Sequence, residues 1–184
     1  MTEKVNLYRR TLWGLFVAAL AFAFVTLMGQ QTVSSDDLTD AVKLRKIESL
    51  CNEYHAEFPE VLEITPRQAM RLIADQKSVF IDLRDQQEQQ VSMLPGAIPE
   101  NEFMNNFKSY DDYVKIAYCT VSYRSEKFAQ MLQKEGIAVY NLRGGILAWV
   151  HDGGKVNNLN GETHRIHVYK SEWNLLPARY EAVW

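Results

Sequence analysis

The chain has 184 residues, of which 47% are hydrophobic and 23% are charged, and its formal net charge at pH 7 is −3. This length accommodates one ordinary globular domain and an additional segment. The acidic balance argues against a nucleic-acid partner, and two cysteines without a Cys/His cluster argue against both a disulfide framework and a metal site.

An uncharged apolar run at residues 12–28 is long enough to cross a bilayer as a helix. Basic residues precede the run and aspartates follow it, so the positive-inside rule leaves the N-terminus in the cytoplasm. We therefore expect a single-pass membrane protein whose domain lies on the extracytoplasmic (periplasmic or lumenal) side. A signal peptide cleaved near Ser35 is the alternative, and it gives a secreted domain. The expected segments are a cytoplasmic tail at 1–10 and a transmembrane helix at 11–29.

Residues 30–62 are predicted to form a polar linker and an amphipathic helix. Val42, Ile47, Leu50 and Tyr54 fall near one face of that helix. Cys51 lies within it, and we expect a half-buried structural residue there; a resolving thiol for Cys119 is the alternative.

Strands and helices alternate through the centre of the chain. Thr65 and Pro66 are typical of a helix start. Strands are predicted at 78–85, 114–118 and 137–142, because these segments are short, apolar and rich in β-branched residues. This alternation indicates an α/β fold with a parallel sheet.

Cys119 stands where the strand at 114–118 gives way to a helix, in the segment "YCTVSYRS". In an α/β sheet, ligands bind at the carboxyl ends of the strands, where this cysteine lies. The amide groups of the turn and of the first helical turn converge there and favour an anion. A cysteine reacts as its thiolate, which a helix N-terminus and a nearby cation such as Arg124 favour. A buried cysteine beside a solvated arginine is the alternative.

Three segments resemble the rhodanese family of sulfurtransferases: "VFIDLRDQQEQQVSMLPGAIP", the active-site loop "CTVSYRS" and the closing "YNLRGGILAW". The resemblance implies a rhodanese-like parallel sheet flanked by helices over residues 63–154, followed by a C-terminal extension at 155–184. It implies that Cys119 carries sulfane sulfur as a persulfide, moved from a donor such as thiosulfate or another persulfide to a thiol or cyanide acceptor. No metal and no organic cofactor is implied.

The resemblance also assigns residues by position. The substrate- and persulfide-binding loop comprises Thr120, Val121, Ser122, Tyr123, Arg124 and Ser125. A structural rather than catalytic motif comprises Asp82, Arg84, Gly144, Gly145 and Trp149. Arg143 is a possible attraction point for an anionic donor, with a solvated loop arginine as the alternative.

Two features of the loop bear on which activity it supports. Ser122 stands where glycine is common in the family, and a positive φ there would cost on the order of 1 kcal/mol. Only four residues separate Cys119 from Arg124, a ring that suits one sulfur atom better than the phosphate of a cysteine-dependent phosphatase. The remaining alternative is a membrane-tethered binding or redox-sensing module without turnover. The extension is expected to pack against the domain, although His164 and His167 could line an opening.

Overall fold

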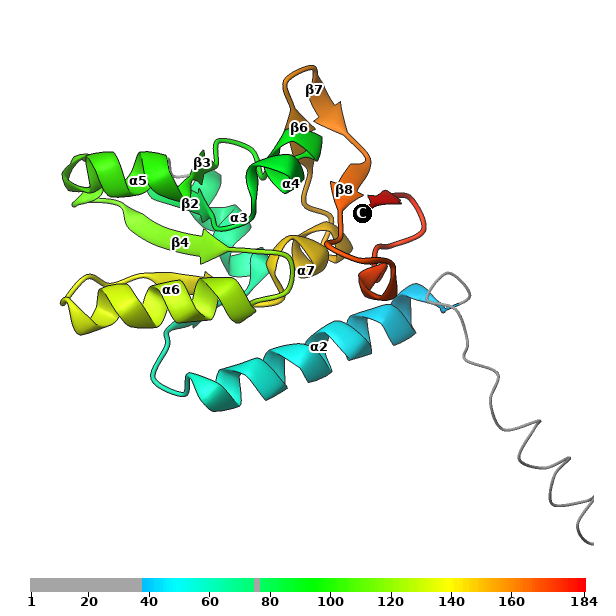
Figure 1. The fold of residues 1–184 in the computed structure, drawn as a ribbon, viewed down its shortest axis with the longest axis horizontal. Helices are drawn as coiled ribbons and strands as arrows, with labels where there is room; N and C mark the ends of the chain where they lie inside the picture. Colours follow the sequence, from blue (N-terminus) through cyan, green and yellow to red (C-terminus); the bar gives the residue numbers. More distant parts are fainter. Residues whose placement is uncertain (1–37, 75–76) are drawn as a thin grey trace, which may run out of the picture. The chain divides into compact units, whose positions relative to one another are not determined.

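The computed structural model describes residues 38–74 and 77–184, which form a five-stranded sheet with helices on both faces (Figure 1). Every pair of neighbouring strands in this sheet is parallel, in the order β1-β5-β4-β2-β3. The strands are β1 (Glu63–Ile64), β2 (Ser78–Asp82), β3 (Ile98–Pro99), β4 (Val114–Tyr118) and β5 (Tyr140–Leu142). The predicted α/β fold with a parallel sheet is confirmed.

Alternate side chains of the strands enter two separate apolar clusters, as the period of two in a strand requires. Phe80 and Ile116 pack toward α3 (Pro66–Ala74) and α7 (Gly145–His151). Val79 and Ala117 pack toward α5 (Glu100–Asn106) and α6 (Tyr123–Lys134). Both faces of the sheet are therefore covered, which is the usual condition of a parallel sheet.

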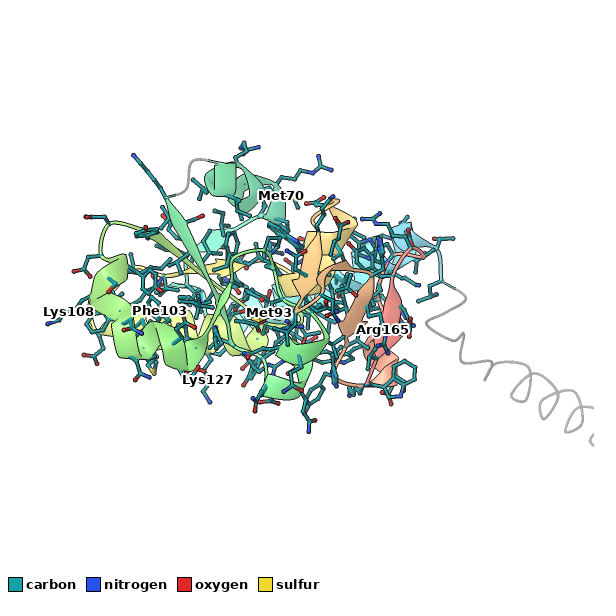
Figure 2. All side chains as sticks on the ribbon, turned by 90° about the horizontal axis from the view of Figure 1, so that it is seen from above. Met70, Met93, Phe103, Lys108, Lys127 and Arg165 are labelled. Atoms are coloured by element: carbon teal, nitrogen blue, oxygen red, sulfur yellow. The ribbon has the colours of Figure 1, made fainter. Side chains whose placement is uncertain are left out.

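Side chains are buried where the helices meet the sheet and exposed on the outer surface of the helices. Phe103 of α5 is fully buried in the interior, whereas Lys108 and Lys127 point outward at the periphery (Figure 2). The 3₁₀ helix η2 (Phe107–Tyr110) continues α5 toward β4.

Helix α2 (Asp40–Glu57) runs alongside α6 and α7 (Figure 1). Its buried side chains are Lys43, Ile47 and Cys51. This packing brings Cys51 to the rear of the loop that follows β4, a proximity that no pattern in the sequence predicts.

The C-terminal extension has its own small elements: β6 (Val156–Asn158), β7 (Gly161–Thr163), β8 (Arg165–His167), the 3₁₀ helix η3 (Ser171–Trp173) and β9 (Glu181–Val183). β6 pairs with β7 and β8 pairs with β9. Ile166, Leu175 and Leu176 are buried in the same cluster as α7. The expectation that the extension packs against the domain is confirmed.

The expected transmembrane helix at 11–29 lies outside the described residues. Across 38–74 and 77–184, no helix combines the length and the apolar character that a bilayer span needs. Strand boundaries were predicted too generously, since β2 ends at Asp82 and β5 begins only at Tyr140.

Candidate active site

Cys119 immediately follows β4, and α6 begins four residues later at Tyr123. The first amide groups of a helix have no acceptor within the helix. The turn between β4 and α6 therefore brings several N–H donors near the sulfur of Cys119. The rear of the turn is held by α7, because the amides of Ile146 and Leu147 donate to the carbonyls of Cys119 and Thr120 at 3.0 and 3.3 Å. The predicted position of the cysteine at a strand-to-helix turn is confirmed.

Ser122 adopts a φ of 100°, in a region that favours glycine. Its hydroxyl accepts a hydrogen bond from the Gly144 amide at 2.8 Å and lies 3.7 Å from the sulfur of Cys51. The Ser122 side chain thus has two effects. It makes this backbone conformation costly, and its hydroxyl ties the loop to the start of α7.

We expect Ser122→Ala to lower the free energy of unfolding by about 1–3 kcal/mol, because it keeps the strained backbone and leaves the buried Gly144 amide without its acceptor. Urea denaturation measures the change. Ser92→Ala is the matched control: Ser92 is equally buried, but its hydroxyl has no hydrogen-bond partner among the described residues, so its removal is expected to be neutral or stabilising. Equal losses in the two variants would contradict this account of Ser122.

Arg124 is not a free cation beside the cysteine. Its guanidinium donates two hydrogen bonds to the Glu88 carboxylate, at 2.7 and 2.9 Å, and a third to the hydroxyl of Thr120 at 3.1 Å. Glu88 lies in α4 (Gln86–Val91) and is 2% exposed, whereas the Arg124 side chain is 30% exposed, so water reaches the pair from the arginine side only. Glu88 orients Arg124 and offsets its charge, and sequence reasoning missed this residue because it lies far along the chain.

Burial raises the pKa of Glu88, but its hydrogen bonds and proximity to Arg124 outweigh burial and hold the pKa below its ordinary value. The ion pair therefore stabilises the fold above about pH 4.5, and this contribution disappears as the pH falls through the lowered folded-state pKa. We expect Glu88→Gln to destabilise the protein at pH 7 and to destabilise it progressively less as the pH falls below about 4.5. Thermal unfolding across this range tests it, and a constant difference between the two proteins would contradict it.

A hydrogen-bonded chain connects the cysteine to β5. The hydroxyl of Ser125 lies 3.6 Å from the sulfur of Cys119 and donates to Asn141 Oδ1 at 2.7 Å. Asn141 Nδ2 in turn donates to Glu126 Oε1 at 3.1 Å. All four residues are buried, so the orientation of Ser125 depends on side chains beyond the loop.

A pocket of about 200 Å³ opens over the cysteine. Its lining residues are Cys119, Thr120, Val121, Tyr123, Arg124, Tyr169 and Trp173. The rings of Tyr169 and Trp173 lie 5.8 Å apart and come from the C-terminal extension, and Arg124 lies 5.9 Å from the Tyr169 ring. Tyr169 and Trp173 are site residues that the sequence did not reveal; His164 and His167, which were considered instead, are not among the lining residues.

Asp82 and Arg84 form a buried ion pair at 2.7 Å, reinforced by the Tyr118 hydroxyl, which donates to Asp82. Trp149 is 2% exposed, and its indole donates to the Lys155 carbonyl at 2.8 Å. None of these side chains lines the pocket. Their placement agrees with the structural role that the resemblance implied.

Arg143 does not line the pocket either. Its guanidinium is paired with Glu63 at 2.6 Å and with Glu48 at 2.7 Å, on the side of the sheet where α2 lies. The expected attraction of an anionic donor by Arg143 has no support in this placement. Cys51, by contrast, lies behind the loop, where burial raises the pKa of its thiol to about 11 and keeps it protonated at neutral pH.

The described residues with metal-ligating side chains include one cluster, formed by His55, Glu63 and Glu126, that the sequence did not predict. It lies behind β5, separated from the pocket by Asn141 and Ser125. None of these three residues lines the pocket over Cys119.

Comparison with known proteins finds matches to the central part of the chain. The family described as "Rhodanese-like domain" matches residues 65–152. A curated relative from Synechocystis sp., named tRNA uridine(34) hydroxylase, is 34% identical over 99 residues, covering 47% of this chain and 35% of the relative. A protein of the same name from Buchnera aphidicola subsp. Schizaphis graminum is 32% identical over 102 residues, covering 50% of this chain and 33% of that protein. The match thus spans only about a third of the length of these relatives.

These names contradict the expected activity. We expected transfer of sulfane sulfur from a donor such as thiosulfate to a thiol or cyanide, whereas the curated relatives are named hydroxylases of a tRNA uridine. The same names conflict in part with the expected absence of a nucleic-acid partner. That expectation rested on composition and net charge, which average over the whole chain and do not describe one pocket.

The arrangement of the sheet has a counterpart among solved structures. The structure of a thiosulfate sulfurtransferase from Pseudomonas aeruginosa superimposes with a TM-score of 0.51 at 23% identity, covering 65% of this chain and 24% of that one. At this identity the likeness concerns the fold alone. Residues 65–152 thus match the model of the rhodanese-like family, and their parallel sheet has the arrangement seen in that structure.

Proposed function

We propose that this domain is a cysteine-dependent enzyme that acts on the uracil ring of a uridine, with Cys119 as the nucleophile. The observation that carries the proposal is the pocket over Cys119, whose walls include Tyr123, Tyr169 and Trp173. Unstacked bases bind between aromatic side chains and arginine planes in this manner. The names of the curated relatives, which specify a tRNA uridine, point to the same ring.

The chemistry requires a thiolate below an unsaturated ring. The sulfur electron pair forms a bond to C6, and the π electrons of the C5=C6 bond move into an enolate over C5, C4 and O4. Protonation at C5 by solvent neutralises the enolate; loss of the original C5 proton and expulsion of the thiolate then restore the ring. An electrophilic oxygen donor reacting at C5 would turn the same adduct toward hydroxylation.

The covalent step has a direct readout, because a C5 proton exchanges with solvent deuterium each time the adduct forms and reverses. We expect the wild-type protein in D₂O to erase the NMR signal of the uridine C5 proton, and Cys119→Ser to abolish the exchange. Trp173→Ala should weaken binding at least about fivefold, since stacking contributes about 1–3 kcal/mol per base. Trp184→Ala is the control, because Trp184 is 64% exposed and does not line the pocket. No exchange by the wild type with any uridine substrate would overturn the proposal.

Two kinds of substrate carry the uracil ring: an RNA, and a free nucleoside or nucleotide. A larger groove of about 580 Å³ shares Tyr123 and Arg124 with the pocket and carries Lys127 and Lys134, which could contact RNA phosphates. Exchange in a tRNA transcript that falls with Lys127→Glu, while exchange in free uridine does not, would identify RNA as the substrate. Equal effects on both would identify the free nucleoside or nucleotide.

Location bears on the same choice. We propose, from the sequence alone, that residues 11–29 anchor the domain outside the cytoplasm, where a free nucleoside or nucleotide is the accessible source. Protease protection of a C-terminal tag on sealed membranes tests the orientation. A tag on the cytoplasmic side would instead give the domain access to tRNA, and a soluble product beginning near Asp36 would show a cleaved signal.

A further inference from the structure

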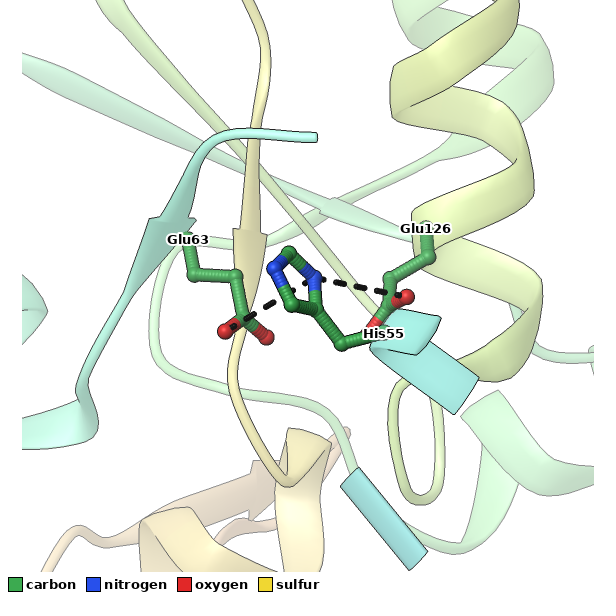
Figure 3. Close-up of side chains that lie close together, drawn as sticks. All are labelled: His55, Glu63 and Glu126. Carbon is green, nitrogen blue, oxygen red and sulfur yellow. Dashed lines mark ion pairs between the residues drawn. The ribbon is translucent and has the colours of Figure 1, made fainter. Parts of the chain in front are cut away.

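Three side chains from separate elements converge behind β5: His55 from α2, Glu63 from β1 and Glu126 from α6 (Figure 3). Nδ1 of His55 lies 3.9 Å from Glu63 Oε2 and 3.9 Å from Glu126 Oε2. The three candidate ligand atoms all lie within 4.8 Å of one another. The imidazole thus sits between two carboxylates, and neither of its two contacts is short enough for a hydrogen bond.

Two of these atoms are buried without a hydrogen-bond partner among the described residues: Glu126 Oε2 and His55 Nδ1. The side chain of Glu126 is 0% exposed, so water cannot solvate the oxygen freely. Burial, and secondly Glu63, raise the pKa of Glu126 to about 7. An unsatisfied carboxylate oxygen in such a position is costly, and a bound cation is one way to satisfy it.

The outer oxygens of both carboxylates are already positioned. Asn141 Nδ2 donates to Glu126 Oε1 at 3.1 Å and to Glu63 Oε1 at 3.3 Å, so Oε2 of each carboxylate faces the imidazole. Arg143 Nη1 donates to Glu63 Oε2 at 2.6 Å, and a carboxylate oxygen has a second lone pair for a metal. Such outer partners orient metal ligands in known sites.

Charge favours the same conclusion. Glu48, Glu57, Glu63 and Glu126 supply four negative charges when ionised, and Arg143 supplies one positive charge, so the group carries −3. A divalent cation offsets two of these charges. The side chains of His55 and Glu63 are 32% and 18% exposed, which leaves a solvent-facing side for entry of the ion and for a water ligand.

We propose that His55 Nδ1, Glu63 Oε2 and Glu126 Oε2 bind one divalent transition-metal ion, for which Zn²⁺ is the probe. One imidazole, two carboxylates and a water form a tetrahedral set that suits Zn²⁺, whereas Mg²⁺ and Ca²⁺ require more oxygen ligands. At metal–ligand distances of about 2.1 Å, tetrahedral ligands lie about 3.4 Å apart. Side-chain rotations therefore have to close each 3.9 Å separation by about 0.5 Å, and the separation of the two carboxylate oxygens, which is at most 4.8 Å, by at most about 1.4 Å.

The test measures binding to the full chain after removal of metals by a chelator. All proteins carry Cys119→Ser, which removes the more accessible thiol and makes the readout independent of the function proposed above. We expect competition with a zinc indicator to give one Zn²⁺ per chain, with at least tenfold weaker binding in His55→Ala and in Glu126→Gln. Mg²⁺ should not compete.

The matched controls carry the same kinds of substitution at residues outside the cluster. His164→Ala and Glu53→Gln change exposed residues outside it and should bind Zn²⁺ as the parent does. Equal binding by Glu126→Gln and Glu53→Gln would overturn the proposal. If a cluster variant does not fold, ¹⁵N NMR of the parent decides: a Zn²⁺-dependent shift of His55 Nδ1 supports the site, and an unchanged resonance refutes it.

Discussion

Asp82→Ala is expected to lower the free energy of unfolding by about 3–5 kcal/mol, the largest stability effect that we predict for one substitution. The carboxylate accepts two hydrogen bonds from the Arg84 side chain, at 3.0 and 2.7 Å, and one from the Arg84 backbone amide at 3.0 Å. Both side chains are 0% exposed. Removing Asp82 therefore leaves a fully buried guanidinium without its counter-charge, and urea denaturation should show the loss.

The pair itself, rather than either residue, is what the fold requires. Replacing both residues, as Asp82→Ala with Arg84→Met, removes the uncompensated charge and is expected to recover a measurable part of the loss. Arg67→Ala with Asp152→Ala is the surface control, since Arg67 is 77% exposed and its pair with Asp152 should contribute at most about 1 kcal/mol. A double variant less stable than Asp82→Ala would contradict this explanation.

Much of the fold follows from local sequence signals. The segments at 78–85 and 114–118 predict the buried strands β2 and β4, and Thr65 with Pro66 predicts the start of α3. Cys119 was correctly placed at the strand-to-helix turn because a strand pattern and a helix pattern adjoin there. These signals extend over a few residues, so composition and periodicity reveal them.

The parts of the site that the sequence did not reveal depend on contacts between distant segments. Glu88 reaches Arg124 across 36 positions, and Tyr169 reaches the pocket only because the extension folds back over α7. No pattern within one segment encodes such pairings. Arg143 shows the converse: its place beside the glycine pair suggested a role near Cys119, but Glu48 and Glu63 hold its side chain elsewhere.

Gly145→Ala is expected to lower the free energy of unfolding by about 2–4 kcal/mol and to reduce the deuterium exchange proposed for Cys119 at least tenfold. Gly145 has a φ of 53°, and a Cβ there would lie 2.3 Å from the Cys119 carbonyl oxygen and 2.7 Å from that of Thr120. Both contacts are to backbone, so the loop itself must move. A displacement of about 1 Å at a reacting group can cost a hundredfold in rate.

The steric part of this effect can be separated from the backbone strain. Gly153 also has a positive φ, of 91°, but a Cβ there would meet nothing within 4 Å. Gly153→Ala should therefore show only the strain, about 1–2 kcal/mol, with exchange unchanged. Alkylation of Cys119 by iodoacetamide gives a second readout that does not depend on the proposed substrate, and we expect its rate to change in Gly145→Ala alone. If the two variants lose the same stability and keep the same thiol reactivity, the contact between α7 and the loop does not position Cys119, because the new methyl group meets the backbone of that loop only at Gly145.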